Sequence, residues 1–224
     1  MNLFDLAERQ ASKWRRTEAR GQETKVATYP LVLVSRQHGT DGAAIGQRVA
    51  DQLGFDFWDH KLLHEMAKHG GLAEILLSSL DERPKNVFLE AFAANKHICP
   101  TTSEYMRELL FQFQIIGHHG NAVVLGRGAQ FALESPRTFR VRLIAPPEHR
   151  AKQRAVQQGI EENEARAEID QVDAARAKFI YEQWSRDIDD LHAYDLLVNV
   201  EYLSMETAAD AIVTAYQGRF NLAF

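Results

Sequence analysis

The residues with the clearest chemical potential lie in a polar loop, residues 35–42, that follows the apolar run Leu31 to Val34. Glycines in such a loop let backbone N–H groups curl around an anion, and the N-terminus of a following helix adds partial positive charge. Gly39 and Gly42 lie in this loop, and an amphipathic stretch follows at once. This order of strand, loop and helix predicts a phosphate-binding loop.

The loop departs from the pattern that binds a nucleoside triphosphate. The Walker pattern G-x-x-x-x-G-K-[ST] supplies a Lys for the outer phosphates and a hydroxyl for Mg²⁺. Aligned on Gly42, those two positions are Ala43 and Ala44, and Gln37 replaces the first glycine. Asp41 opposes an anion about 5 Å away by on the order of 1–3 kcal/mol at an effective dielectric near 20, unless it holds Mg²⁺ or points outward and caps the helix. A tight turn that binds no ligand stays open as an alternative.

Other kinds of site fit the spacing less well. A dinucleotide fold needs G-x-G-x-x-G, whereas the glycines here are Gly39, Gly42 and Gly46. The sequence HEMAKH is one residue longer than the zinc motif H-E-x-x-H, so its two histidines face apart on a helix. His60 and His64 lie on one helix face without a third ligand at a fixed spacing. We therefore expect no protein-held metal.

Positive charge for phosphate chemistry is available elsewhere in the chain. Phosphoryl transfer depends on positioning and on stabilising charge, with little covalent participation by protein groups. Arg127 directly follows the apolar run 122–126, so we expect it at the carboxyl edge of a parallel sheet, where ligands bind. The candidate cations are Arg36, Arg127, Arg150, Arg154 and Arg176. Alternatively, Arg127 is a surface arginine at a turn. Arg150, Arg154 and Arg176 would then lie on solvated, charged helix faces.

Strands and helices alternate along the chain. Apolar runs at 31–34, 122–126, 138–145 and 194–200 predict buried strands, which argues for an α/β fold with a parallel sheet. Boundary signals for the intervening helices are Gly54, Thr101 with Glu104, Gly117, Pro147, Gly159 and Ser204. Further helices are predicted at 60–69, 72–80, 86–98 and 161–184, and a turn is predicted at 117–120.

The composition bounds the class of protein. The chain has 224 residues, is 45% hydrophobic and 25% charged, and fits one large globular domain. Its formal net charge of -5 argues against a general nucleic-acid binder. A single cysteine, the lack of a long apolar run and a polar N-terminus lead us to expect a cytoplasmic protein without a membrane span.

Residues 1–29 form a charged extension. Phe4, Leu6, Ala11 and Trp14 have helical spacing, which predicts a surface helix or an arm that docks a partner. A frayed tail is the alternative.

Five segments in register resemble the cytidylate kinase-like family, a branch of the P-loop nucleoside monophosphate kinases. They are SRQHGTDGAAIGQRVADQLGFDFWDHKLL, VVLGRGAQFAL, RLIAPPEHRAKQR, VDAARAKFIYEQW and YDLLVNVEYLSMETAADAI. The resemblance implies a three-layer P-loop NTPase-like α/β fold over residues 30–224, with five parallel strands. It also implies a helical insertion at about 59–118 that binds the monophosphate and a lid at about 157–190 that closes over the phosphates.

The resemblance implies a role for each candidate residue. The expected catalytic residues are Arg127, Arg150 and Arg176. The expected ligands of the donor, ATP with Mg²⁺, are Arg36, Gly39, Thr40 and Gly42. The expected ligands of the acceptor, a nucleoside monophosphate such as CMP, are Asp59, Arg127 and Arg154. For Asp59, an N-cap of the following helix is the alternative.

In this family the loop usually reads S-R-x-x-G-S-G-G-R-E-I, and its last arginine replaces the Walker lysine. Here that position is Ala43. Two functions therefore stay open. The chain transfers the γ-phosphoryl group of ATP to CMP or a related monophosphate, or it is a catalytically weakened protein that binds a nucleotide or phosphate and acts in regulation or interaction.

Overall fold

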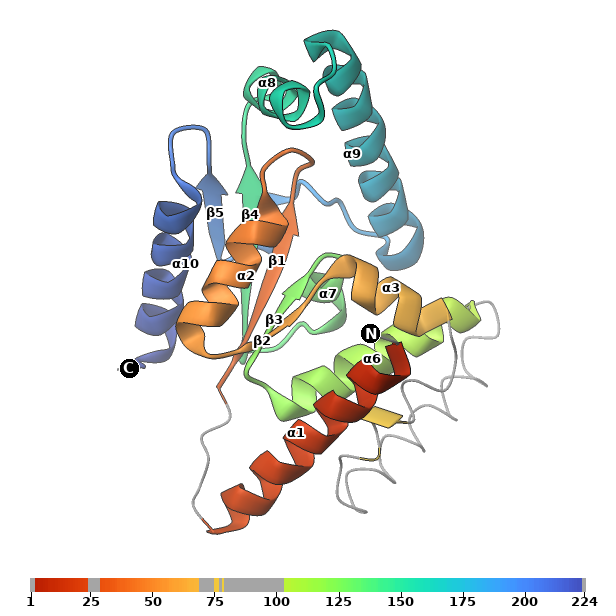
Figure 1. Ribbon diagram of the computed structural model, residues 1–224, viewed down its shortest axis with the longest axis vertical. Coiled ribbons are helices and arrows are strands. Elements are labelled where there is room, and N and C mark those ends of the chain that lie inside the picture. The colour runs from red at the N-terminus through yellow and green to blue at the C-terminus, as the bar shows by residue number, and fades with distance from the viewer. Residues whose placement is uncertain (1–2, 24–28, 69–74, 77, 79–102, 223–224) are drawn as a thin grey trace. The chain divides into compact units, whose positions relative to one another are not determined.

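A computed structural model describes residues 3–23, 29–68, 75–76, 78 and 103–222 of the chain (Figure 1). Its centre is a sheet of five strands: β1 (Leu31–Arg36), β2 (Asp56–Trp58), β3 (Ala122–Leu125), β4 (Thr138–Ile144) and β5 (Leu196–Asn199). The strand order is β2-β3-β1-β4-β5, and every pairing is parallel. The predicted α/β class with a parallel sheet is confirmed.

The central strand β1 and its neighbour β3 carry apolar residues on both faces. Every residue of β3 is buried, as are the first five of β1, because helices cover a parallel sheet on both sides. In the register, Val34 pairs with Leu125 and Arg36 pairs with Leu143. The carboxyl ends of β1, β3 and β4 therefore meet at one edge, and the loop after each strand begins there.

The helices around the sheet begin and end largely where the sequence predicts. They are α2 (Gly42–Leu53), α7 (Ala129–Ala132), α8 (Pro147–Gln158), α9 (Glu162–Trp184) and α10 (Met205–Phe220), with a short 3₁₀ turn η1 (Leu191–Ala193). Gly54 and Gly159 end α2 and α8 in the left-handed conformation, and the Ser204 side chain caps α10. In Figure 1, α2 and α10 lie side by side.

Helices α8 and α9 form a hairpin with a small core of its own. Ala151 and Ala155 of α8 pack against Ala165 and Ile169 of α9, and Ile160 in the connection covers this cluster. Small side chains let the two helices approach closely. The hairpin thus holds the side chains of both helices in fixed positions at its end of the sheet.

The chain divides into two compact units. One unit contains Pro30–Asp59 and Asn121–Phe224, and the other contains Met1–Tyr29 and His60–Gly120. The second unit is helical, with α1 (Leu3–Glu23), α3 (His60–Lys68) and α6 (Glu104–His119). The N-terminal extension therefore belongs to the same compact unit as the predicted insertion.

The described part of the extension is a helix rather than a frayed tail. Ala7, Ala11 and Trp14 are buried along one face of α1, at the spacing that a helix face requires. The Trp14 ring stacks on His119 of α6, with 4.0 Å between ring centroids and 14° between planes. The side chains of Phe4 and Leu6 lie outside the described residues.

Two boundary predictions for α6 are wrong. The helix begins after Ser103, whose side chain accepts a hydrogen bond from the Met106 amide. It also continues through the residues predicted as a turn and ends at His119, where the Gly120 amide donates to the Ile116 carbonyl and the His119 ring stacks on Trp14. Thr101, most of the helix predicted at 72–80 and the helix predicted at 86–98 lie outside the described residues.

None of the helices in the described part of the chain is long and apolar enough to cross a membrane.

We expect His119 to make the free energy of unfolding depend on pH. Burial, followed by repulsion from His118, lowers the pKa of His119 from 6.5 to about 3. Between these values the unfolded chain binds the additional proton, so stability is complete above pH 6.5 and falls with decreasing pH by up to about 1.4 kcal/mol per unit. In His119→Phe, which keeps a ring on Trp14, that part of the slope should disappear.

Urea titrations at pH 7.5, 6 and 5 measure the slope. His192→Gln, at an exposed position, is the control and should retain the slope of the unmodified protein. Equal slopes in all three proteins would contradict the assignment to His119.

Candidate functional site

The loop after β1 is held in place by its own polar groups. The Gln37 amide donates to the Leu143 carbonyl at 3.0 Å, and the Gln37 side chain accepts from the Ala145 amide at 3.1 Å. The Thr40 hydroxyl donates to the Gln37 carbonyl at 2.8 Å, and Thr40 is only 2% exposed. Thr40 was predicted to bind ATP, the phosphoryl donor. Its side chain instead forms a hydrogen bond within the loop and so helps to hold the shape of the loop.

The two loop glycines permit close approach by arginine side chains. A Cβ added to Gly39, whose φ is +82°, would lie 3.1 Å from the Arg150 Cβ and 3.2 Å from the Arg154 Cγ. A Cβ added to Gly42 would lie 2.8 Å from the Arg36 Cγ. Gly39 and Gly42 thus let α8 and the end of β1 contact the loop directly.

The Arg36 side chain crosses the carboxyl edge of the sheet. Its aliphatic part lies over Gly42, at the start of α2, and its guanidinium group reaches Gly126, in the loop after β3. A Cβ on Gly126 would collide with the Arg36 Nη1. A cation therefore lies between the phosphate loop and the Gly126-Arg127-Gly128 loop, although the loop itself lacks its usual Lys or Arg.

Arg36 lies in a crowd of like charges. Burial lowers its pKa to about 9, and repulsion from neighbouring guanidinium groups adds to this effect. Those groups belong to Arg176, Arg127 and Arg142. Burial also lowers the pKa of Arg176, against the opposing effect of Asp173. Such crowding disfavours the ionised arginines and would be relieved by an oxyanion bound among them.

The loop after β3 has a strained backbone. Gly126, Arg127 and Gly128 all have positive φ, at 79°, 56° and 76°. A left-handed conformation costs a non-glycine residue such as Arg127 about 1–2 kcal/mol. Contacts with α9 hold the loop, because the Arg127 guanidinium lies 5.7 Å from the centre of the Phe179 ring and Gly128 contacts the Trp184 indole. Strained residues of this kind gather at functional sites.

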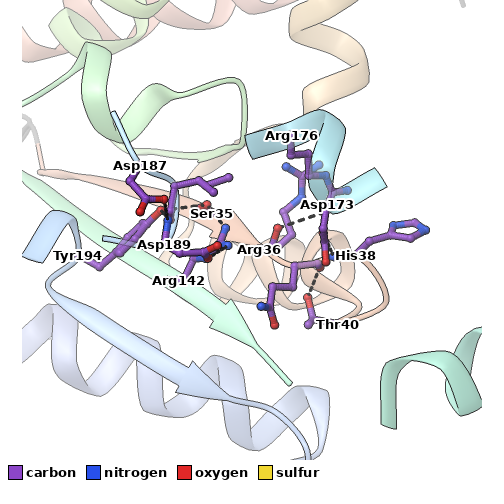
Figure 2. Close-up of polar contacts among 12 residues, drawn as sticks. Ser35, Arg36, His38, Thr40, Arg142, Asp173, Arg176, Asp187, Asp189 and Tyr194 are labelled. Carbon is purple, nitrogen blue, oxygen red and sulfur yellow. Dashed lines mark hydrogen bonds and ion pairs between the residues drawn. The ribbon is translucent and has the colours of Figure 1, made fainter. Parts of the chain in front are cut away.

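Asp173 of α9 connects that helix to the phosphate loop (Figure 2). One carboxylate oxygen accepts from the His38 backbone amide at 2.8 Å, and the other accepts from the Arg150 Nη1 at 2.6 Å. The same Arg150 nitrogen donates to the His38 carbonyl at 2.9 Å. The Arg176 Nη1 donates to the Arg36 carbonyl at 3.1 Å. Arg150 and Arg176 thus hold the loop and α9 together.

A second carboxylate lies on the outer side of this connection. Glu168 of α9 accepts from the Arg154 Nη2 at 2.7 Å and lies 2.8 Å from the His38 Nε2. The bonds with His38 and then Arg154 lower the pKa of Glu168. Arg154, which was predicted to bind the acceptor nucleotide, is therefore paired with Glu168 in the hairpin of α8 and α9.

Arg142 is a part of the site that the sequence reading missed. It lies on β4 and is 4% exposed. Its Nη1 donates to the Ser35 hydroxyl at 2.8 Å, and its Nη2 donates to Asp189 at 2.6 Å (Figure 2). Tyr194, which also contacts Ser35, has its pKa raised by burial. The sequence offered one sign of its role, which is that an arginine lies within a strand of a parallel sheet where most residues are apolar.

The remaining predicted residues lie at the same edge or close to it. Asp59 directly follows β2, whose Trp58 pairs with Val124 of β3, so Asp59 is at the carboxyl edge of the sheet. Asp41 occupies the N-cap position of α2 with φ of 50°, but its side chain does not cap the helix. Its carboxylate accepts from the Gln157 side chain instead.

The arrangement suits oxyanions better than a protein-held metal. Within the described ranges, no group of three or more His, Cys, Asp or Glu side chains is placed to hold a metal ion. His64, considered as half of a metal pair, contacts the Tyr105 hydroxyl at 3.2 Å.

Comparison with known proteins gives a family and a fold. The sequence model of the cytidylate kinase-like family matches residues 31–202. No curated protein matches the chain significantly. An uncharacterized protein from Eubacterium ventriosum ATCC 27560 has a similar crystal structure, with a TM-score of 0.66 and 20% identity, covering 84% of this chain and 98% of that one. This likeness shows a common fold.

Two kinases resemble the chain more weakly. A shikimate kinase from Bacteroides thetaiotaomicron is 16% identical, with a TM-score of 0.48 and coverage of 88% of this chain and 100% of its own. A gluconokinase from Sinorhizobium meliloti 1021 is 12% identical, with a TM-score of 0.49 and coverage of 86% and 94%. Likeness at this level carries no conclusion about what the chain does.

We expect Gly126→Ala to displace Arg36 and to weaken anion binding. The added Cβ collides with the guanidinium group, and the positive φ costs a further roughly 1 kcal/mol of stability. Gly54→Ala is the matched control, because Gly54 also has positive φ but has nothing within 4 Å of an added Cβ. Calorimetry with pyrophosphate should show weaker binding for Gly126→Ala alone. Equal binding by both variants would show that the Arg36 position does not matter to the anion.

Proposed function

We propose that this protein, which belongs to the cytidylate kinase-like family because that family's model matches most of its length, transfers the γ-phosphoryl group of ATP to a nucleoside monophosphate of the CMP kind. The observation that carries the proposal is the crowding of guanidinium groups around Arg36, next to a loop of the phosphate-binding type. Phosphoryl transfer needs such a concentration of positive charge around its equatorial oxygens.

Each residue at this edge has a role in the proposal. Arg36 lies between the loops after β1 and β3, so its guanidinium is placed to contact a phosphoryl group that passes between donor and acceptor. Arg127, held by Phe179, binds the phosphate of the acceptor. Arg176 and Arg150 position α9 against the loop and stabilise negative charge there. Asp59 lies at the same edge as a ligand of the acceptor.

ATP supplies the transferred group, and Mg²⁺ neutralises part of the charge on its phosphates when both are bound. The described residues fit this combination, since they offer several arginines for phosphate oxygens and no cluster of metal ligands. The chain's own contribution is to bind and orient the phosphates and to surround them with fixed positive charge. A cytoplasmic setting, which the single cysteine favours, is part of this proposal.

A second candidate function is supported by one observation. The positions where the family loop carries its cation and the residue after it are Ala43 and Ala44, and Ala43 is exposed at the start of α2. A chain with this loop that binds a nucleotide or phosphate without turning it over would act in regulation or interaction. Measured phosphoryl transfer separates the two functions.

A coupled assay with Mg-ATP and a panel of nucleoside monophosphates tests the proposal. We expect turnover with a pyrimidine monophosphate, and its absence with every monophosphate would leave the regulatory function. Arg127→Ala should weaken monophosphate binding by roughly 1.5–3 kcal/mol, the scale of a hydrogen bond to a charged group. Arg137→Ala, at an exposed position before β4, is the control and should bind as the unmodified protein does. An equal loss of monophosphate affinity in both variants would show that Arg127 is not a ligand of the acceptor.

The double variant Asp41→Gly with Ala43→Arg should tighten ATP binding and raise kinase activity. Gly suits the positive φ at position 41, and the exposed position 43 has room for an arginine that reaches the outer phosphates. Calorimetry with Mg-ATP measures the change. If the unmodified protein already binds Mg-ATP at about the micromolar level, near −8 kcal/mol, and the double variant gains nothing, then another residue supplies the missing charge. Arg36 and the arginines of the predicted lid are the first candidates.

A further inference from the structure

The Asp173 carboxylate lies where the phosphate loop offers its hydrogen-bond donors. A phosphate-binding loop recognises an anion through backbone N–H groups, supported by positive side chains. Here the His38 amide donates to the Asp173 Oδ1 at 2.8 Å, and the Arg150 Nη1 donates to the Oδ2 at 2.6 Å. The two oxygens of one carboxylate thus accept from a loop amide and from a buried arginine, as two oxygens of a phosphate group would.

The positive charge around Asp173 exceeds what this single carboxylate can balance. Arg150 is 4% exposed, and Arg176 lies 3.6 Å from the Asp173 Oδ1. Arg36, whose carbonyl binds Arg176, lies beside the same group and is repelled by its arginine neighbours. A phosphate group carries more charge than a carboxylate and has more acceptor oxygens, so it matches this surrounding better than Asp173 does.

We infer that Asp173 fills an anion position in the ligand-free protein, and that a phosphate group binds to the His38 amide and Arg150 by displacing it. The ligand class is a phosphate monoanion or dianion, free or as part of a nucleotide. The inference deepens the proposed function and rests on it only in treating the loop as a phosphate site. Displacement removes one of the bonds by which α9 holds the loop, so binding is linked to a movement of Asp173 and its helix.

The helix is connected to the loop by few other bonds. Arg176 donates to the Arg36 carbonyl, and Glu168 contacts the His38 ring. Asp173 alone on α9 accepts from a loop amide among the bonds that the described residues form. Removal of its charge should therefore change anion binding more than removal of another carboxylate from the same helix.

Asp170 provides that comparison. It lies on α9 three residues before Asp173, and its side chain is 60% exposed. Its carboxylate binds Arg166 on the same helix and does not reach the loop. Asp170→Asn thus removes the same charge from the same helix and leaves the anion position unchanged.

Calorimetric titration with inorganic phosphate tests the inference. Asp173→Asn and Asp173→Ala should bind phosphate about three- to tenfold more tightly than the unmodified protein, because a competing like charge has gone. Asp170→Asn should bind as the unmodified protein does. Unchanged or weaker binding in both Asp173 variants would overturn the inference and make Asp173 a residue that only holds the loop or contacts the ligand itself. Tightening by Asp170→Asn to the same extent would also overturn it, because the effect would then be one of net charge.

The unmodified protein gives a test that does not depend on the folding of a variant. The amide resonance of His38 should shift and saturate during titration with phosphate, because its acceptor changes from Asp173 to the ligand. No shift at saturating phosphate would overturn the inference. The outcome is separate from that of the kinase assay, since phosphate can displace Asp173 in a protein that shows no turnover with any monophosphate.

Discussion

The guanidinium group of Arg36 lies half-buried at the carboxyl edge of a parallel sheet, with three other arginines close enough to repel it. In an environment of low polarity such repulsion is expensive, and the neighbouring carboxylates offset only part of it. Asp173 lies next to Arg150 and Arg176, and Asp189 binds Arg142. Two carboxylates of α9, Asp173 and Glu168, lie on the side that faces the loop and α8.

The same edge of the sheet carries a cation although Ala43 stands where the family loop has its second arginine. The family pattern carries two arginines, one at the end of the strand and one in the first turn of the helix after the loop. This chain has the first, as Arg36, and has Ala43 at the position of the second. Here Arg36, from the end of β1, crosses Gly42 and reaches the loop after β3. A cation at the end of a buried strand is more rigid than one on an exposed helix turn, because packing fixes its aliphatic part. The cost is that it lies among other arginines, which an anion must balance.

The buried strands of the sheet and most helix ends could be predicted from the sequence. Continuous apolar runs identify β1 and β3 as buried strands, and Gly54, Gly159 and Ser204 act at helix ends through local backbone chemistry. The sequence was not sufficient for α6. The sequence TTSE offers several residues that can cap a helix, and Ser103 is the one that does so. The last turn contains His119, whose partner Trp14 is far away in the chain, so no local pattern shows that contact.

The sequence also predicted which arginines stand near the phosphate loop better than it predicted their partners. Arg142 alternates with apolar residues along β4, which reads equally well as a solvated strand face, and only the position of Ser35 on the neighbouring strand shows that this face is buried at the site. Asp173 occurs in a helix with many charged residues, and no local pattern distinguishes it from the exposed Asp170. The hydrogen-bond partners of such residues depend on which face of the helix packs against the loop, and this is a property of the folded chain.

The connection through Asp173 has a consequence for how the site exchanges ligands. The Arg150 guanidinium cannot be left without an acceptor at low cost, because Arg150 is 4% exposed, and the partly buried His38 amide also loses its acceptor when Asp173 leaves. Exchange of one anion for another avoids that cost, since a phosphate oxygen can take over each hydrogen bond as the carboxylate leaves. Under the inference drawn above, the loop retains its shape in such an exchange. A preformed loop of this kind lowers the cost of ordering on binding, so that more of the attraction between arginines and phosphate appears as affinity.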